Sequence, residues 1–286
     1  MNIEDFIIRG SEVKNPPKLF GFKTGVPGLD DMFYTITWSD NKPVKSSLGG
    51  IPAFSVVNLT GMPDTGKSLI ANQYTIKQTS MGYPVLFVTT ETPAEFLIVS
   101  LMQKAKAMGT DWDNIKDNVW IVDASKNSIL REDIPTLLKT MEKTIEMGNT
   151  KSIIIDSITG LFEDREMKAR SIVRQIYSFA KHHRQTTILV NQKRSGHDEI
   201  SAEAAGGFAV AHIADVNIVL WKVTVTKKWE AQLYGSPIGS LVRFIRVDGC
   251  RVSGHDQKTH FLEITDTGLV KIGPPLGENK GETGDE

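Results

Sequence analysis

Cysteine is almost absent from this sequence: Cys250 is the one cysteine among 286 residues. A single cysteine excludes an internal disulfide, so the chain is not one of the small secreted proteins whose folds depend on such bonds. A reducing cytoplasm is the compartment that this composition favours. Because unpaired cysteines are commonly buried, we interpret Cys250 as a structural residue.

Long apolar runs and an excess of one charge are also lacking. No stretch of about 18 apolar residues occurs, so the sequence predicts no membrane-spanning helix. Residues 1–5 lack an apolar run and predict no signal peptide. Lys and Arg number 33 against 34 Asp and Glu, which leaves a net charge of -1. This balance argues against a generally basic surface for nucleic acid, although it leaves room for a local basic patch.

The chain is long enough for one large domain. Its 286 residues are 40% hydrophobic, which suffices for a full core. We predict a polar arm at residues 1–17 and one domain at residues 18–272, with an inserted loop or hairpin at about residues 34–47. Residues 273–286 are rich in Gly, Pro, Glu and Asp, and we expect them to form a disordered acidic tail.

Apolar runs alternate with helical patterns along the predicted domain. Runs typical of buried strands are residues 55–59, 85–89, 119–122, 152–155 and 186–190. Helical periodicity marks residues 67–80, 94–108, 133–147 and 167–183, the third of these closed by Gly148. This alternation predicts an α/β fold with a mostly parallel, twisted sheet flanked by helices. Residues 216–225, 241–247 and 259–264 are short and β-rich, and they predict antiparallel strands added at the C-terminal edge.

A glycine-rich loop follows the first buried strand. The pattern G-x-x-x-x-G-K-[ST] is matched by Gly61, Met62, Pro63, Asp64, Thr65, Gly66, Lys67 and Ser68. The predicted nucleotide-binding residues are Gly61, Pro63, Asp64, Thr65, Gly66, Lys67, Ser68 and the next residue, Leu69. Lys67 would contact the β and γ phosphates, and the Ser68 hydroxyl would bind Mg²⁺, while loop amides surround the phosphate oxygens. The alternative, a glycine turn with an incidental lysine, leaves the strand before it and the helix after it unexplained.

Two acidic residues stand at the ends of later strands. Asp156 follows the strand at 152–155, at the sheet edge where ligands bind in open α/β folds. We predict that it holds Mg²⁺ with Ser68; a helix N-cap is the alternative. Glu91 follows the strand at 85–89, and we predict that it is the general base that orients the attacking water. A glutamate favoured by a helix dipole is the other interpretation.

Motifs elsewhere resemble those of the RecA/RadA/KaiC superfamily of P-loop ATPases. They occur in the family order at residues 22–30, 48–52, 88–93, 156–162 and 264–269. The resemblance covers about residues 20–273 and implies a RecA-like core that binds ATP and Mg²⁺ at subunit interfaces of a ring or filament. KaiC-type domains are commonly hexameric and hydrolyse ATP slowly, which implies a homohexamer here.

The resemblance implies two further site residues. Residues 241–249 resemble the KaiC strand whose basic residues reach the γ-phosphate of the next subunit, and Arg246 matches its lysine. A surface strand arginine is the alternative for Arg246. Residues 189–192 resemble a RecA and RadA motif that ends in a glutamine, which makes Gln192 a candidate γ-phosphate sensor.

The sequence departs from the family pattern at several positions. Thr90 stands where KaiC has the first of two adjacent acids, and Asp248 stands where it has an arginine. The insertion at residues 34–47 either contacts a protein partner or forms a solvated loop. The loop at residues 193–199, where recombinases bind DNA, carries both signs of charge, so DNA binding is the less favoured interpretation.

These observations favour a Mg²⁺-dependent ATPase of the KaiC/RecA type with a regulatory or signalling role. Two alternatives stay open. In the first, ATP holds an assembly together and turnover is incidental, which the substitution at Thr90 favours. In the second, the protein is an accessory of DNA recombination or repair that resembles RadA paralogues.

Overall fold

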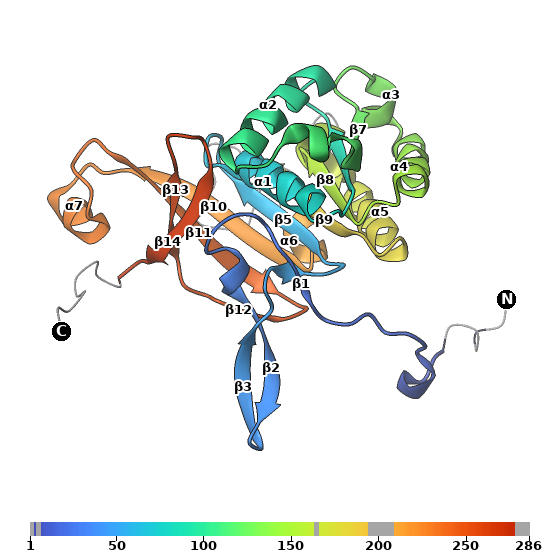
Figure 1. Cartoon of the computed structure of the whole chain (residues 1–286), viewed down its shortest axis with the longest axis horizontal. Coiled ribbons are helices and arrows are strands. Elements are labelled where there is room, and N and C mark those ends of the chain that lie inside the picture. Colours follow the sequence, from blue (N-terminus) through green and yellow to red (C-terminus); the bar gives the residue numbers. More distant parts are fainter. Residues whose placement is uncertain (1–2, 4–6, 163–165, 194–208, 278–286) are drawn as a thin grey trace.

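A mixed sheet runs through the centre of the molecule (Figure 1). The computed structural model describes residue 3 and residues 7–162, 166–193 and 209–277. In spatial order the sheet contains β14 (Val270–Pro275), β13 (His260–Ile264), β11 (Leu241–Cys250), β10 (Val216–Thr224), β5 (Val56–Gly61), β9 (Thr186–Gln192), β8 (Ser152–Asp156), β6 (Val85–Thr89) and β7 (Val119–Asp123). The strands from β10 to β7 are parallel, and β11, β13 and β14 pair antiparallel. The predicted α/β fold with antiparallel strands at the C-terminal edge is confirmed.

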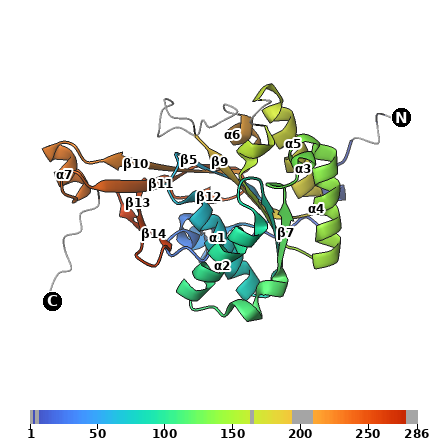
Figure 2. The ribbon, with the colours of Figure 1, turned by 90° about the horizontal axis from the view of Figure 1, so that it is seen from above.

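Helices cover both faces of this sheet (Figure 2). On one face lie α1 (Lys67–Ser80) and α2 (Ala94–Ala107), and on the other lie α4 (Ile134–Gly148), α5 (Ala169–His182) and α6 (Ala209–Ile213). Strand β6 shows why both faces are covered. Its alternate residues Val85 and Phe87 pack with α1 and α2, whereas Leu86 and Val88 pack with α4 and α5. Side chains alternate between the faces of a strand, so a continuous apolar run needs a helix layer on each side.

Shorter elements complete the described part of the chain. They are β1 (Gly21–Phe22), β4 (Ile51–Pro52), β12 (Gly254–His255), α3 (Ser128–Glu132), α7 (Lys228–Tyr234) and the 3₁₀ helices η2 (Gly10–Glu12), η3 (Asp30–Met32), η4 (Trp112–Asn114), η5 (Lys116–Asn118), η6 (Ile158–Leu161) and η7 (Glu166–Lys168). Strands β10 and β11 continue beyond the rest of the sheet as a two-stranded ribbon with α7 at its tip (Figure 1). We refer to β10, α7 and β11 as the ribbon.

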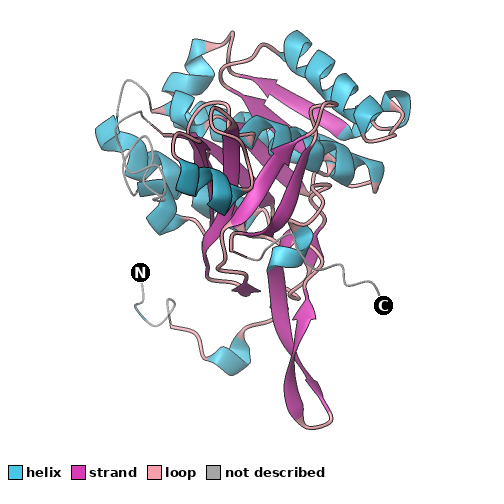
Figure 3. Ribbon diagram, turned by 90° about the vertical axis from the view of Figure 1, so that its left-hand side faces the viewer, coloured by secondary structure: helices cyan, strands magenta, loops and turns pink. Residues whose placement is uncertain are grey.

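The inserted segment near residue 40 is a hairpin that projects from the body of the protein (Figure 3). It consists of β2 (Phe33–Ser39) and β3 (Lys42–Ser47), whose register leaves a two-residue turn. The turn residues Asp40 and Asn41 have φ values of 49° and 59°. Two left-handed residues match the right-handed twist of the flanking strands, which is why such short turns select Asp, Asn and Gly. Of the two conformations that the sequence left open, the hairpin is the correct one.

The direction of β10 differs from the prediction. Residues 216–225 were expected to form an antiparallel edge strand, but β10 pairs parallel with β5 and only its other neighbour, β11, is antiparallel. The reason is burial on both faces: from Val216 to Trp221 all residues but Asn217 are buried. Interior parallel strands have this composition, and the antiparallel order begins one strand later.

Two predicted boundaries also move. Gly148 was expected to close its helix after residue 147, but it is the last residue of α4, and Asn149 follows with a left-handed φ of 45°. Gly148 is needed for packing instead, because a Cβ there would lie 2.5 Å from Nε1 of Trp120. Strand β14 continues to Pro275, so the boundary predicted for the disordered tail, residue 273, lies inside a strand. Residues 278–286 of that tail lie outside the described residues.

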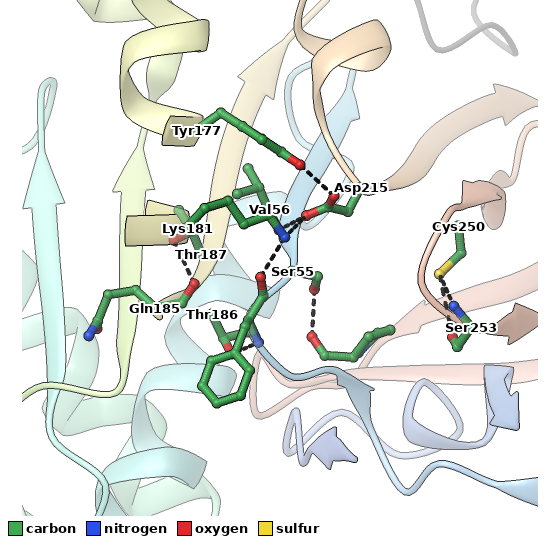
Figure 4. Close-up of polar contacts among 12 residues, drawn as sticks. Ser55, Val56, Tyr177, Lys181, Gln185, Thr186, Thr187, Asp215, Cys250 and Ser253 are labelled. Atoms are coloured by element: carbon green, nitrogen blue, oxygen red, sulfur yellow. Dashed lines mark hydrogen bonds and ion pairs between the residues drawn. The ribbon is translucent and has the colours of Figure 1, made fainter. Parts of the chain in front are cut away.

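A buried carboxylate joins three elements at the amino end of β5 (Figure 4). Asp215 is 6% exposed and accepts a hydrogen bond from the backbone N–H of Val56 at 2.8 Å. Tyr177 donates to Oδ1 of Asp215 at 3.0 Å, and the Lys181 ammonium forms an ion pair at 2.5 Å with Oδ2, the oxygen that accepts from Val56. Burial and the neighbouring Asp215 carboxylate raise the pKa of Tyr177, so the phenol remains a donor. Asp215 thus ties α5 and the start of β10 to the strand that leads into the glycine-rich loop.

Figure 4 also shows the single cysteine, Cys250, with its neighbour Ser253. Cys250 ends β11, is partly exposed, and accepts a hydrogen bond from the Ser253 N–H to its sulfur at 3.4 Å. It also packs against the main apolar core, which agrees with a structural role. None of the helices in the described ranges combines the length and the apolar composition needed to cross a membrane.

Candidate nucleotide-binding site

The glycine-rich loop lies between the carboxyl end of β5 and the start of α1. Gly61, the last residue of β5, has no room for a side chain, because a Cβ would lie 2.3 Å from the carbonyl oxygen of Leu220 on β10. Gly66 precedes α1 with a φ of 102°, which favours glycine. Inside the loop, the Thr65 hydroxyl donates to the carbonyl oxygen of Met62 at 2.8 Å. The loop therefore closes on itself and points the amino end of α1 toward its centre, as phosphate binding requires.

Lys67 is the buried charge of this loop. Its side chain is on the first turn of α1, and the residue is 7% exposed. The ammonium group donates to the carbonyl oxygen of Met62 at 2.7 Å. Burial lowers the pKa of Lys67 to about 8, while the carboxylates of Asp156 and Glu91 act in the opposite direction. A desolvated ammonium beside the loop amides forms strong charge-assisted hydrogen bonds with a phosphate.

Ser68 and Asp156 come together beside Lys67. Asp156 ends β8, and the Ser68 hydroxyl donates a hydrogen bond to its carboxylate. The surrounding protein desolvates Asp156 and raises its pKa to about 6, although the bond from Ser68 and the charge of Lys67 oppose this shift. A hydroxyl and a carboxylate are the hard oxygen ligands that Mg²⁺ prefers next to substrate phosphates. These two residues therefore fit a Mg²⁺ ion.

Glu91 and Gln192 contact each other across the end of the sheet. The amide nitrogen of Gln192 lies 2.9 Å and 3.1 Å from the two carboxylate oxygens of Glu91. The Ser157 hydroxyl donates to the same carboxylate at 2.5 Å. Glu91 is exposed, and its charge acts on Lys67. The structure thus brings the predicted base and the predicted sensor into one hydrogen-bonded group beside the glycine-rich loop, a contact that sequence reasoning missed.

Thr90 points into the protein rather than into the site. It is 5% exposed; its hydroxyl accepts from the Ser157 N–H at 3.0 Å and donates to the Ser157 carbonyl at 2.9 Å. Its own N–H donates to the carbonyl of Asp156 at 3.0 Å. Gly160 lies against it, since a Cβ there would approach the Thr90 hydroxyl to 2.5 Å. Thr90 therefore holds the ends of β6 and β8 together, and its hydroxyl is paired inside the protein.

Arg246 lies apart from this group within one chain. It belongs to the side of β11 that carries Val242 and Phe244, whereas Arg243 belongs to the side that faces α1. Its guanidinium forms an ion pair with Asp248 at 2.6 Å and lies 5.9 Å from the ring centre of Trp221. The structure therefore does not bring Arg246 to the glycine-rich loop of its own chain.

Two basic residues that were not predicted as site residues do contact the loop. Lys222 on β10 and Arg243 on β11 both form ion pairs with Asp64. The signal available in the sequence was weak, because each is a single basic residue within an otherwise ordinary β-rich segment. The loop at residues 193–199, considered above for DNA binding, lies outside the described residues from residue 194 onward.

Comparisons with known proteins show which family and fold the chain resembles. The family model for the KaiC ATPase matches residues 22–277. A UPF0273 protein of Pyrococcus furiosus is 27% identical over 87% of this chain and 92% of its own length. A UPF0273 protein of Thermotoga maritima is 25% identical over 90% of this chain and 98% of its own length. The crystal structure of a KaiC-like protein from Pyrococcus horikoshii shares the fold with a TM-score of 0.67, at 23% identity over 90% of this chain and all of that one.

Proposed function

Because the chain belongs to the KaiC family of ATPases, we propose that it binds ATP with Mg²⁺ at the end of β5 and hydrolyses it slowly. The observation that carries this proposal is the meeting of three groups from separate strands at one sheet edge: Lys67 in its loop, Ser68 with Asp156, and Glu91 with Gln192. Phosphate binding, metal binding and proton transfer each have a residue of suitable chemistry there.

Each residue has a role in this proposal. Lys67 and the loop amides hold the β and γ phosphates, and Ser68 and Asp156 would hold Mg²⁺, which neutralises phosphate charge when it is bound. Glu91 orients a water molecule toward the γ-phosphate and accepts its proton. Gln192 and Ser157 fix the Glu91 carboxylate, and in this proposal Gln192 is also the sensor of the γ-phosphate.

Phosphate release by the purified chain tests this function. We expect slow release from ATP in the presence of Mg²⁺, and release at the background level once EDTA removes the metal, because Ser68 and Asp156 then face the phosphates without a cation between them. Malachite-green detection over hours measures both rates. Binding of ATP without any turnover would favour the alternative in which the nucleotide only holds an assembly together, and the absence of binding would contradict both.

We further propose that the protein forms a ring-shaped homo-oligomer and that the nucleotide site lies at the interface between its subunits. The role proposed for this assembly is regulation or signalling. Exposed apolar side chains on α2 and at the tip of the ribbon support this assembly. On α2, Phe96, Val99 and Met102 are 63%, 55% and 45% exposed and share one helix face by their spacing of three. At the tip of the ribbon, Trp229 and Ile238 are 56% and 57% exposed. Exposed apolar surface of this kind is typical of protein contacts.

Charge on the exposed face of α2 should break this assembly. We expect the wild-type chain to elute as an oligomer with MgATP, and Phe96→Glu to elute near the monomer mass, because a glutamate would be desolvated in an apolar contact. Light scattering coupled to size exclusion measures the mass. Ile129→Glu, which changes a 60% exposed side chain on α3, is the matched control and should leave the mass unchanged. A Phe96→Glu protein of unchanged mass would remove α2 from the interface.

A further inference from the structure

Asp64 places a negative charge in a loop that is proposed to bind phosphates. It lies in the middle of the glycine-rich loop with a left-handed φ of 60°, and its side chain is 68% exposed. Asp is tolerated in this conformation, so the backbone alone does not forbid it. An uncompensated carboxylate close to a nucleotide that carries several negative charges would weaken its binding.

Two cations from the ribbon compensate this carboxylate. The ammonium of Lys222 lies 3.1 Å from Oδ2 of Asp64, and Nη2 of Arg243 lies 3.3 Å from the same oxygen. Nε of Arg243 also donates to the backbone carbonyl of Asp64 at 3.2 Å. Lys222 holds the pKa of Asp64 below its usual range, with Arg243 adding to the effect. Arg243 therefore fixes the backbone of the loop as well as its charge.

The strand register explains why the ribbon reaches the loop. β10 pairs with β5 up to Leu220 opposite Gly61 and then continues past the end of β5. Lys222 is two residues further along, on the same side of the strand as Leu220, and Arg243 is its direct partner on β11. Ile245, on the same side of β11 as Arg243, packs in the core with α1. Both basic side chains therefore point to the side where the glycine-rich loop lies.

Lys222 and Asp64 are both within electrostatic range of Lys67. Lys222 lowers the pKa of the Lys67 ammonium and Asp64 raises it, so the charges on the loop and the ribbon act on one another. The carboxylates of Asp156 and Glu91 also act on Lys67, so acidic groups surround the loop on more than one side. The ion pairs with Lys222 and Arg243 thus offset the one acidic residue that the loop itself carries.

The alternative explanation is that the ion pairs of Lys222 and Arg243 with Asp64 are ordinary surface salt bridges with no role in nucleotide binding. Lys222 and Arg243 are 29% and 21% exposed, and Asp64 is 68% exposed. Ion pairs whose side chains are this exposed to solvent contribute little to the free energy of unfolding. The two explanations therefore differ in nucleotide affinity and not in stability, because a charged phosphate is sensitive to the uncompensated carboxylate whereas the folded state is not.

We propose that Lys222 and Arg243 are positioning residues of the nucleotide site, which hold the glycine-rich loop and neutralise Asp64 so that phosphates can bind next to it. This inference rests on the proposed function. It also makes the ribbon, and anything that moves it, a determinant of nucleotide affinity.

A double-mutant cycle tests this, with the Kd for MgATP measured by calorimetry on the full chain. Lys222→Met should raise Kd about tenfold, because Asp64 then keeps only Arg243 as a partner. Asp64→Asn provides the second background of the cycle. Lys222→Met added to Asp64→Asn should raise Kd by less than about threefold relative to Asp64→Asn alone, because no carboxylate remains to be neutralised. Lys222→Arg should restore binding to within about threefold of wild type.

Controls separate charge from folding and this inference from the proposed function. Lys228→Met removes an exposed lysine of α7 on the same ribbon and should leave Kd unchanged. All variants should melt within about 2 °C of wild type without nucleotide, as expected for exposed ion pairs. An equal loss from Lys222→Met in both backgrounds, or no loss in either, would overturn the positioning role and leave the proposed function standing. A wild-type chain that does not bind MgATP would overturn both.

Discussion

Replacing Lys67 with alanine should raise the Kd for MgATP by at least about 100-fold and reduce phosphate release to the background. Lys67 is 7% exposed and lies against the loop, so its charge acts on a phosphate with little screening by water. Without this ammonium, the backbone amides are the hydrogen-bond donors to phosphate that remain in the loop. Calorimetry with MgATP measures the affinity, and malachite-green detection measures the rate.

The stability of the same variant separates lost binding from lost folding. The folded-state pKa of Lys67, about 8, is below the ordinary value of 10.5, so the folded protein disfavours the charged form. This cost is fully present below pH 8 and is relieved as pH rises from about 8 to 10.5. At pH 7, without nucleotide, Lys67→Ala should therefore be at least as stable to urea as wild type. Lys139→Ala, an exposed lysine of α4, is the matched control for both measurements. Normal MgATP affinity in a folded Lys67→Ala protein would contradict the assignment of the loop.

Glu91→Gln should lower kcat about 100- to 1,000-fold while KM for MgATP changes less than about threefold. The amide can still accept hydrogen bonds from Ser157 and Gln192, so the geometry of the site is retained. It cannot take a proton from the attacking water, and that loss affects the transition state more than substrate binding. Steady-state phosphate release at saturating and limiting ATP gives both constants.

Two comparisons make the Glu91 result decisive. Glu95→Gln changes an exposed acid four residues away that pairs with Lys126, and it should leave kcat within about twofold. Gln192→Ala should lower kcat less than Glu91→Gln does, because it loosens the carboxylate without removing it. If Glu91→Gln turns over like wild type, another group is the base, and the buried Thr90 is not it.

Local patterns were sufficient for the course of the backbone around the site. Residues 67–80 and 85–89 were predicted as a helix and a strand and are α1 and β6 with the same bounds. Periodicity succeeds there because it reports a property of neighbouring residues, namely which faces of an element are apolar. The glycine-rich loop was found for the same reason: its residues are contiguous, and their spacing is set by the loop itself.

Strand direction and side-chain contacts needed the tertiary structure. β10 was expected to be antiparallel, but an apolar run has the same composition whether its neighbours run with it or against it. The burial of Thr90 depends on Ser157, 67 residues away, and not on any pattern around Thr90. Sequence reasoning could note only that an expected acid was missing at this position.

By itself, then, the sequence determined the α/β fold, the loop at Gly61–Ser68 and the strand ends that carry Glu91 and Asp156. Only the tertiary structure decided that Gln192 holds Glu91 from 101 residues away, and that Lys222 reaches Asp64 across 158 residues. The physical reason is that such contacts depend on the spatial order and register of the strands. β5 lies between β10 and β9, and this order places the ribbon on one side of the loop and Gln192 on the other.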